Sequence, residues 1–126
     1  MPHTITYNPD LSIIKIKFEG NITLNETKEI FSESLQIANE QNCFLFLSDY
    51  REAIMKLSTF EIYELPKILS NVFVASKIPV HRLKRALVVA KDLEDYRFFE
   101  VVTANQGQNV KLFQDLDEAK KWLLSA

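Results

Sequence analysis

Glycine is scarce in this chain. Gly20 and Gly107 are the only two among 126 residues, so neither a Walker loop nor a dinucleotide-binding GxGxxG motif can be present. Positive charge is not in excess either, because 15 Lys and Arg residues stand against 17 Asp and Glu residues, for a formal net charge of −2. Proteins that hold nucleic acid by neutralising phosphates need the opposite balance. We therefore expect no nucleic-acid partner and no cofactor.

Cysteine and long apolar runs are also lacking. Cys43 is the only cysteine, so no intrachain disulfide can form, and its apolar neighbours predict a buried thiol without a redox role. The longest apolar runs fall far short of the roughly 20 residues that cross a bilayer. The beginning of the chain has no basic segment followed by an apolar stretch, as a secretory signal would. These features predict a cytoplasmic protein that is not an integral membrane protein.

Apolar residues, in contrast, are abundant. The chain is 47% hydrophobic and contains nine Phe, which is enough apolar surface for a folded core. A length of 126 residues is typical of one domain. Because no repeat, charge block or Pro/Ser-rich linker interrupts the sequence, we predict a single domain over residues 1–126.

The first third of the chain predicts a hairpin followed by a helix. Residues 4–7 favour a short strand, and residues 11–19 alternate apolar and charged side chains, as a half-buried strand does. Thr23 and Glu26 have the spacing of a capping box. A helix is therefore expected over residues 24–41, with an apolar stripe that packs on the sheet, formed by Ile30, Phe31, Leu35 and Ala38.

The middle of the chain predicts an interior strand and a second helix. Residues 43–47 are apolar at every position, which is typical of a strand covered on both faces, and this strand should end in residues 48–51. Ser58 and Glu61 repeat the capping pattern and open the second helix. Pro66 should kink or restart that helix.

The remaining elements complete an alternating order. Residues 85–90 favour a strand, residues 96–104 a helix that Gly107 ends, and residues 110–113 the last strand. Asp115 is expected to cap a terminal helix. The order β-β-α-β-α-β-α-β-α predicts an α/β fold with a five-stranded, mostly parallel sheet.

Several short motifs occur in this order. A glycine follows the second strand, Asp49-Tyr50-Arg51 closes the third, Arg-Ala-Leu-Val-Val begins the fourth, and residues 113–123 read Phe-x-Asp-x-x-Glu-Ala-x-x-Trp-Leu. In these features nearly the whole chain resembles the SpoIIAA-like family, which is related to STAS domains and to the lipid-binding Sec14 or CRAL-TRIO fold. The resemblance implies a sheet wound in one direction, helices mainly on one face, and a regulatory or lipid-binding role without catalysis.

STAS proteins that antagonise anti-sigma factors carry a phosphorylated Ser in an Asp-Ser-x-Gly turn. The corresponding segment here, residues 56–60, lacks both the Asp and the Gly. Ser58 and Thr59 could still accept a phosphate at a helix start. An ordinary N-cap is the favoured interpretation, because Ser and Thr are preferred at that position.

The residues after the third strand form a candidate functional rim. Asp49, Tyr50 and Arg51 are expected just past its carboxyl end, where α/β proteins gather functional groups, and Asp92 follows the next strand on the same edge. The alternative is a structural ion pair or cap. Neither catalytic residues nor a metal site are expected, because no nucleophile motif and no His or Cys at ligand spacing is present.

A basic segment, residues 81–85, could contact anionic lipid or an acidic partner together with Lys77. A solvated loop is the favoured interpretation, because so few cations are a weak signal.

The second and third helices carry more large apolar residues than one buried stripe needs. Core packing, self-association and an apolar ligand pocket each explain them. The pocket would be lined by Phe60, Tyr63, Phe73, Tyr96 and Phe99. Consecutive apolar residues in the strands also put hydrophobic side chains on both sheet faces. We therefore predict a homodimer that covers the second face or the apolar helices.

Together these features predict a non-catalytic SpoIIAA/STAS-like module that regulates or binds a protein partner. The alternative is a carrier or sensor of a small lipid-like ligand.

Overall fold

The computed structural model describes residues 3–55, 58–75, 77, 82–90 and 109–125. The helices and strands in these ranges are β1 (His3–Asn8), β2 (Ile13–Ile22), α1 (Leu24–Gln41), β3 (Leu45–Met55), α2 (Thr59–Ala75), β4 (Lys84–Val88), β5 (Asn109–Phe113) and α4 (Leu116–Leu124).

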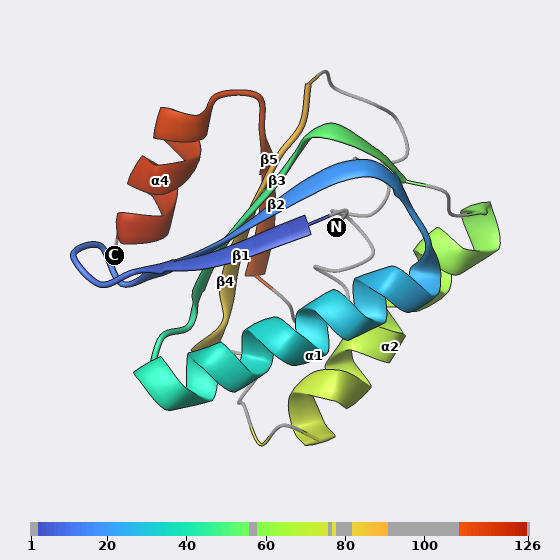
Figure 1. The fold of residues 1–126 in the computed structure, drawn as a ribbon, viewed down its shortest axis with the longest axis horizontal. Helices are drawn as coiled ribbons and strands as arrows, with labels where there is room; N and C mark the ends of the chain where they lie inside the picture. Colours follow the sequence, from blue (N-terminus) through green and yellow to red (C-terminus); the bar gives the residue numbers. More distant parts are fainter. Residues whose placement is uncertain (1–2, 56–57, 76, 78–81, 91–108, 126) are drawn as a thin grey trace.

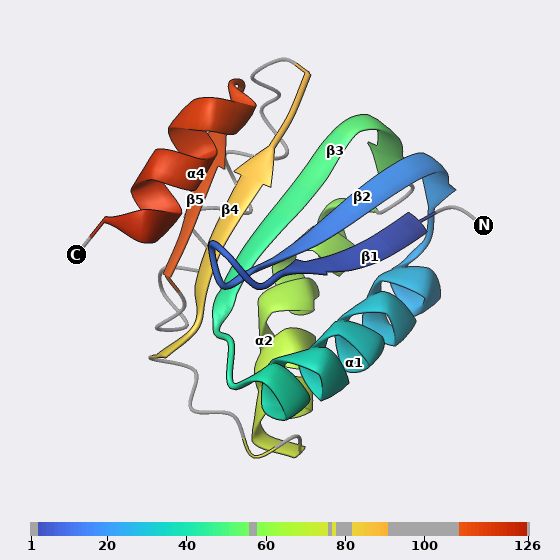
Figure 2. The ribbon, with the colours of Figure 1, turned by 60° about the vertical axis from the view of Figure 1, so that its left-hand side comes forward.

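The strands form one sheet in the order β1-β2-β3-β4-β5, so each strand lies beside the one that precedes it in sequence (Figure 1, and side by side in the turned view of Figure 2). β1 and β2 pair antiparallel as a hairpin. The other three pairings are parallel. The predicted α/β fold, with a five-stranded and mostly parallel sheet wound in one direction, is confirmed in these respects.

The helices lie on both faces of the sheet. α1 and α2 lie on one face, which we call the first face, and α4 lies on the other, the second face (Figures 1 and 2). The prediction of helices mainly on one face therefore applies to α1 and α2, and α4 departs from it. The helix expected over residues 96–104 lies outside the described residues.

Local capping signals determine where α1 begins and ends. The Thr23 hydroxyl accepts a hydrogen bond from the Glu26 backbone N–H (3.3 Å) and donates one to the Glu26 carboxylate (3.0 Å). At the other end Asn42 adopts a left-handed conformation and its N–H bonds to the carbonyl of Ala38. The predicted bounds of this helix and its buried stripe are confirmed.

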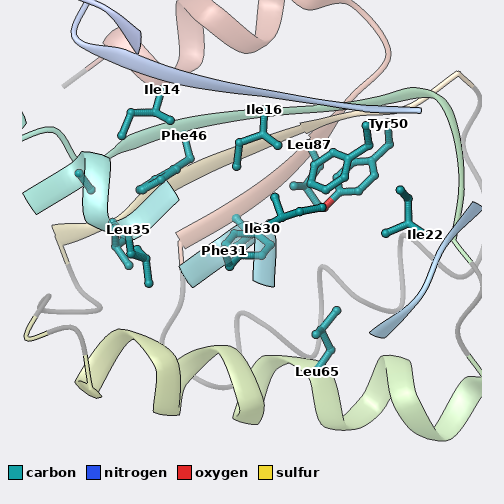
Figure 3. Close-up of a cluster of buried hydrophobic side chains, with 14 of the residues drawn as sticks. Ile14, Ile16, Ile22, Ile30, Phe31, Leu35, Phe46, Tyr50, Leu65 and Leu87 are labelled. Atoms are coloured by element: carbon teal, nitrogen blue, oxygen red, sulfur yellow. The ribbon is translucent and has the colours of Figure 1, made fainter. Parts of the chain in front are cut away.

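The main core fills the space between the first face and helices α1 and α2 (Figure 3). Phe18 of β2 and Tyr50 of β3 stack there with their ring centroids 4.3 Å apart. Leu65 contributes from α2. The other fully buried side chains include Ile14, Ile16, Ile22, Ile30, Phe31, Leu35, Phe46 and Leu87.

A smaller core lies between the second face and α4. Its buried members are Ile13, Leu47, Ala86, Val88, Ala119 and Leu123. In the predicted homodimer, a second copy of the chain would cover these strand residues. Because α4 supplies that cover within one chain, this reason for a homodimer does not apply to the residues beneath α4.

Two predicted strand ends are wrong: Gly20 does not follow the second strand but lies within β2, which continues to Ile22. β3 does not end in residues 48–51 but continues to Met55, because these residues keep pairing with β2. Pro66 was expected to kink or restart α2: it does not restart the helix, which runs from Thr59 to Ala75, and the kink stays a prediction.

Only part of the described basic segment is solvated: Arg82 is exposed, whereas Lys84 and Arg85 belong to β4. The Lys84 ammonium donates to the Trp122 and Ser125 carbonyls at the carboxyl end of α4. Arg85 is only 2% exposed and stacks on the Phe31 ring at 4.7 Å. Burial lowers the pKa of Arg85 to about 10, although Tyr50 acts in the opposite direction, so the guanidinium stays protonated at neutral pH. Lys84 thus binds the carboxyl end of α4, and Arg85 packs against Phe31 in the core.

No helix within the described ranges is long and apolar enough to span a membrane.

Candidate functional site

Asp49 and Arg51 lie inside β3, not beyond its end. Alternate residues of a strand point to opposite faces, and the buried neighbour Leu47 belongs to the core beneath α4. Asp49 and Arg51 therefore lie on the second face, with Lys17 of β2 directly beside Asp49 in the strand register. The sheet face itself, and not a loop, carries these charges.

A β-bulge adds a further charge to the same face. Between the Lys17–Asp49 and Glu19–Glu52 pairs, β2 contributes Phe18 alone, whereas β3 contributes both Tyr50 and Arg51. The extra residue shifts the alternation of side chains along β3. Although Glu52 is the next residue after Arg51, it therefore lies on the same face, and both side chains line one pocket.

Asp49 and Arg51 form a bidentate ion pair. Arg51 Nε donates to Asp49 Oδ1 at 2.9 Å, and Arg51 Nη2 donates to Asp49 Oδ2 at 2.8 Å. The Arg51 backbone N–H also donates to Oδ1, at 3.1 Å. The Asp49 side chain is 4% exposed and that of Arg51 is 42% exposed. The carboxylate is therefore buried beneath a guanidinium that still reaches solvent.

This pairing keeps both groups ionised. Burial raises the pKa of the Asp49 carboxyl, but the hydrogen bonds and charge of Arg51 lower it more, with a smaller contribution from Lys15, so the net pKa is below its ordinary value. The side-chain hydrogen bond to Asp49 raises the pKa of Arg51. Neither group titrates near neutral pH.

Lys17 and Glu52 complete the site. Lys17 Nζ lies 3.2 Å from Glu52 Oε2 and 3.8 Å from Glu19 Oε1. The hydrogen bond and charge of Glu52 raise the pKa of Lys17, which therefore stays protonated. Lys17, Asp49, Arg51 and Glu52 line a pocket of about 260 Å³, which we call the charged pocket.

Tyr50, the other predicted rim residue that the structure describes, does not line this pocket. Tyr50 points to the first face, where it is 6% exposed and stacks on Phe18 (Figure 3). Asp92 lies outside the described residues. Among the rim residues within the described ranges, the structure thus brings together Asp49 and Arg51.

Lys17 and Glu52 were not predicted as site residues. The signal for Lys17 was its place in the alternating segment of residues 11–19, where the charged positions share one face. Nothing local in the sequence marks Glu52, because its position depends on the bulge at Arg51.

Ser58 caps α2. Its hydroxyl accepts from the Glu61 N–H at 3.1 Å, and its own N–H donates to Glu61 Oε1 at 2.9 Å. The predicted capping box is confirmed. Thr59 is the first residue of α2, and phosphorylation of either residue stays a prediction.

The residues of the predicted apolar pocket are only partly within the described residues. Phe60 is 72% exposed. Tyr63 and Phe73 belong to α2, and Tyr96 and Phe99 lie outside the described residues. The apolar pocket stays a prediction.

Among the described residues, no group of three or more His, Cys, Asp or Glu side chains is arranged to hold a metal ion.

Comparison with known proteins identifies the type of fold. Neither the protein-family models nor the curated proteins gave a match. Among solved structures, the chain is similar to a protein of the DUF3478 family with a SpoIIAA-like fold from Shewanella loihica PV-4, with a TM-score of 0.59 and 16% identity over 96% of this chain and 91% of that chain. At this identity the likeness concerns the fold alone, and it carries no information on the Sec14 relationship. The chain therefore has a SpoIIAA-like fold.

Proposed function

We propose that this protein is a non-catalytic interaction module with a regulatory role, and that the charged pocket is the centre of its binding surface. The observation that carries the proposal is the ion-paired set of Lys17, Asp49, Arg51 and Glu52 on the second face beside α4.

The protonation states in the pocket support binding over catalysis. A general acid or base works best with a pKa near the operating pH. The pKa of Asp49 is lowered and that of Lys17 is raised, so both move away from neutrality. A lysine nucleophile also requires a lowered pKa, which Lys17 lacks.

The exposure of the pocket supports a macromolecular partner. The Lys17, Arg51 and Glu52 side chains are 41%, 42% and 61% exposed, so a partner can reach them without rearranging the core. Charges of both signs lie close together on this surface, and such a pattern selects partners by electrostatic complementarity.

The proposal is tested by affinity capture with the immobilised full chain. We expect at least one native protein to be retained by the wild type and lost from the charge reversals Lys17→Glu and Arg51→Glu. The matched control is Lys28→Glu, because Lys28 is exposed on α1 on the opposite side of the sheet, and it should retain the same protein.

Identical retention by all four proteins, or none above background, would contradict this role for the pocket. If no protein is retained while a fatty acid or phospholipid raises the melting temperature, the carrier of a lipid-like ligand replaces the interaction module.

A further inference from the structure

We propose that the charged pocket binds a carboxylate or phosphate group at the outer edge of the Arg51 guanidinium, and that Glu52 competes with this group for Lys17. The inference rests on the proposed function and names the chemistry that the binding surface recognises.

Arg51 has N–H donors that Asp49 does not engage. A guanidinium carries five N–H donors in a planar fork. Asp49 engages one edge of that fork through Nε and Nη2. The edge formed by Nη1 and the second N–H of Nη2 carries two parallel donors, the arrangement that carboxylates and phosphates bind bidentately.

The ion pair with Asp49 holds this edge of the Arg51 guanidinium in place. Asp49 is held in place by the Arg51 backbone N–H and is 4% exposed, so it acts as a fixed anchor within the sheet. Arginine is a flexible side chain, and fixing it normally costs entropy when a ligand binds. Because the ion pair has already restricted Arg51, less of that cost falls on binding. Asp49 is thus a positioning residue.

The charge of the ligand follows from the groups of the pocket that it can reach. A cation cannot reach the Asp49 carboxylate, since Arg51 covers it. The donors of the pocket remain accessible, because the Arg51 side chain is 42% exposed and that of Lys17 is 41% exposed. A group that binds at these donors is therefore an anion, and it competes with the carboxylates of Glu52 and Asp115, which also act on Arg51.

Glu52 is an ion-pair partner of Lys17 in the charged pocket. Its carboxylate lies 3.2 Å from Lys17 Nζ and is 61% exposed, and solvent-exposed ion pairs of this kind contribute little to stability. Glu52 therefore occupies Lys17 with the same chemical group that a ligand would offer, and it can be displaced. Neutralising Glu52 should leave Lys17 with its longer contact to Glu19, at 3.8 Å, and remove a like charge from the pocket.

The test is a titration of the full chain at low ionic strength with inorganic phosphate in one arm and acetate in the other, followed by the NMR signals of the Arg51 side chain. We expect saturable shifts in the wild type and binding about three- to tenfold tighter in Glu52→Gln. Arg51→Lys should lose most of the affinity, because it keeps the charge but lacks the two parallel donors. Lys28→Ala should bind as the wild type does.

The two arms distinguish the sources of the anion. Tighter binding of phosphate points to a phosphorylated ligand, and tighter binding of acetate points to an acidic side chain or a chain terminus. Thermal melting of each variant shows that it is folded before its affinity is compared.

Three results would overturn the inference: no saturable shift in either the wild type or Glu52→Gln, equal or weaker binding by Glu52→Gln, or undiminished binding by Arg51→Lys. The proposed function fails separately. If the anions bind as expected but no protein depends on Lys17 and Arg51 in affinity capture, only the interaction role is lost. If a protein depends on them but the anions do not bind, only the present inference is lost.

Discussion

Asp49 and Arg51 lie two positions apart on β3 and are joined by two parallel hydrogen bonds, at 2.9 and 2.8 Å. A pair so close in sequence forms as soon as the strand is extended, because both side chains point to the same face. Its contribution to stability and its contribution to binding are separable, since one partner is buried and the other is exposed.

Asp49→Asn should lower the free energy of unfolding by about 1 kcal/mol at pH 7, because it leaves a charged partner without its carboxylate. The folded pKa of Asp49 is lowered, so the unfolded state binds protons first as the pH falls. The stabilisation is complete above the ordinary pKa of about 3.9 and is lost as the pH falls through the lowered folded value.

Urea denaturation from pH 7 to pH 2 measures this effect. The difference between wild type and Asp49→Asn should shrink below about pH 4. Asp10→Asn, at an exposed position in the hairpin turn, should change little. A difference that stays constant over the whole range would contradict the assignment.

Two fully buried serines should respond in opposite directions. Ser34 and Ser48 are both 0% exposed. The Ser34 hydroxyl donates to the Phe31 carbonyl at 2.9 Å, whereas Ser48 Oγ has no hydrogen-bond partner in the described part of the chain. Ser34→Ala should lower stability by about 1 kcal/mol, and Ser48→Ala should raise it by a similar amount, because an unsatisfied buried hydroxyl is costly. Thermal melts that change in the same direction for both variants would refute this.

Two arginines that are close in sequence should also differ. Arg85 is the largest fully buried side chain in the described ranges, so Arg85→Ala leaves a cavity and should cost about 3–5 kcal/mol. Arg82 is exposed and lies over the Phe44 ring at 4.5 Å, so Arg82→Ala should cost less than about 1 kcal/mol. Equal losses in chemical denaturation would argue against the buried position of Arg85.

The last turn of α4 offers a matched pair of leucines. Leu123 is 2% exposed and Leu124 is 50% exposed. Leu123→Ala should lower stability by about 2–5 kcal/mol because it empties part of the core beneath α4. Leu124→Ala should stay within about 0.5 kcal/mol of the wild type. If the two variants unfold at the same urea concentration, α4 does not cover the second face in solution.

Self-association stays a prediction from the sequence, and the structure directs it to α2. Phe60 and Val74 are 72% and 70% exposed there, and large exposed apolar side chains often mark contact surfaces. We expect light scattering to give a dimer mass at micromolar concentrations and a monomer mass for Phe60→Ser combined with Val74→Ser. Ile54→Ser removes an apolar residue that is 58% exposed on β3 and should remain dimeric. A wild-type monomer at every concentration would disprove the dimer.

Elements set by local signals could be predicted from the sequence. Thr23 and Glu26 mark the start of α1 by their spacing alone, and the buried stripe follows from the helical period. Asp115 likewise marks α4, where its carboxylate accepts from the Asp117 and Glu118 N–H groups. Each of these signals lies within one turn of helix.

Features that depend on distant parts of the chain could not be predicted. The polar residues after Leu47 indicated the end of the strand, because the sequence does not show that the residues up to Met55 pair with β2. Glu52 meets Lys17 only through parallel pairing and a bulge. Arg85 was interpreted with its basic neighbours, although it is buried in the structure and lies over the ring of Phe31 from a distant helix.

The order of the strands has a consequence for synthesis. Because each strand pairs with the one before it, the sheet can grow at one edge while the chain leaves the ribosome, without a late strand having to insert between early ones. The cover of the second face arrives late, since α4 follows all five strands. Until then Leu47 and Val88 lack the cover that α4 supplies. We expect this interval, with an apolar sheet face open to solvent, to be the stage at which the nascent chain most depends on chaperones.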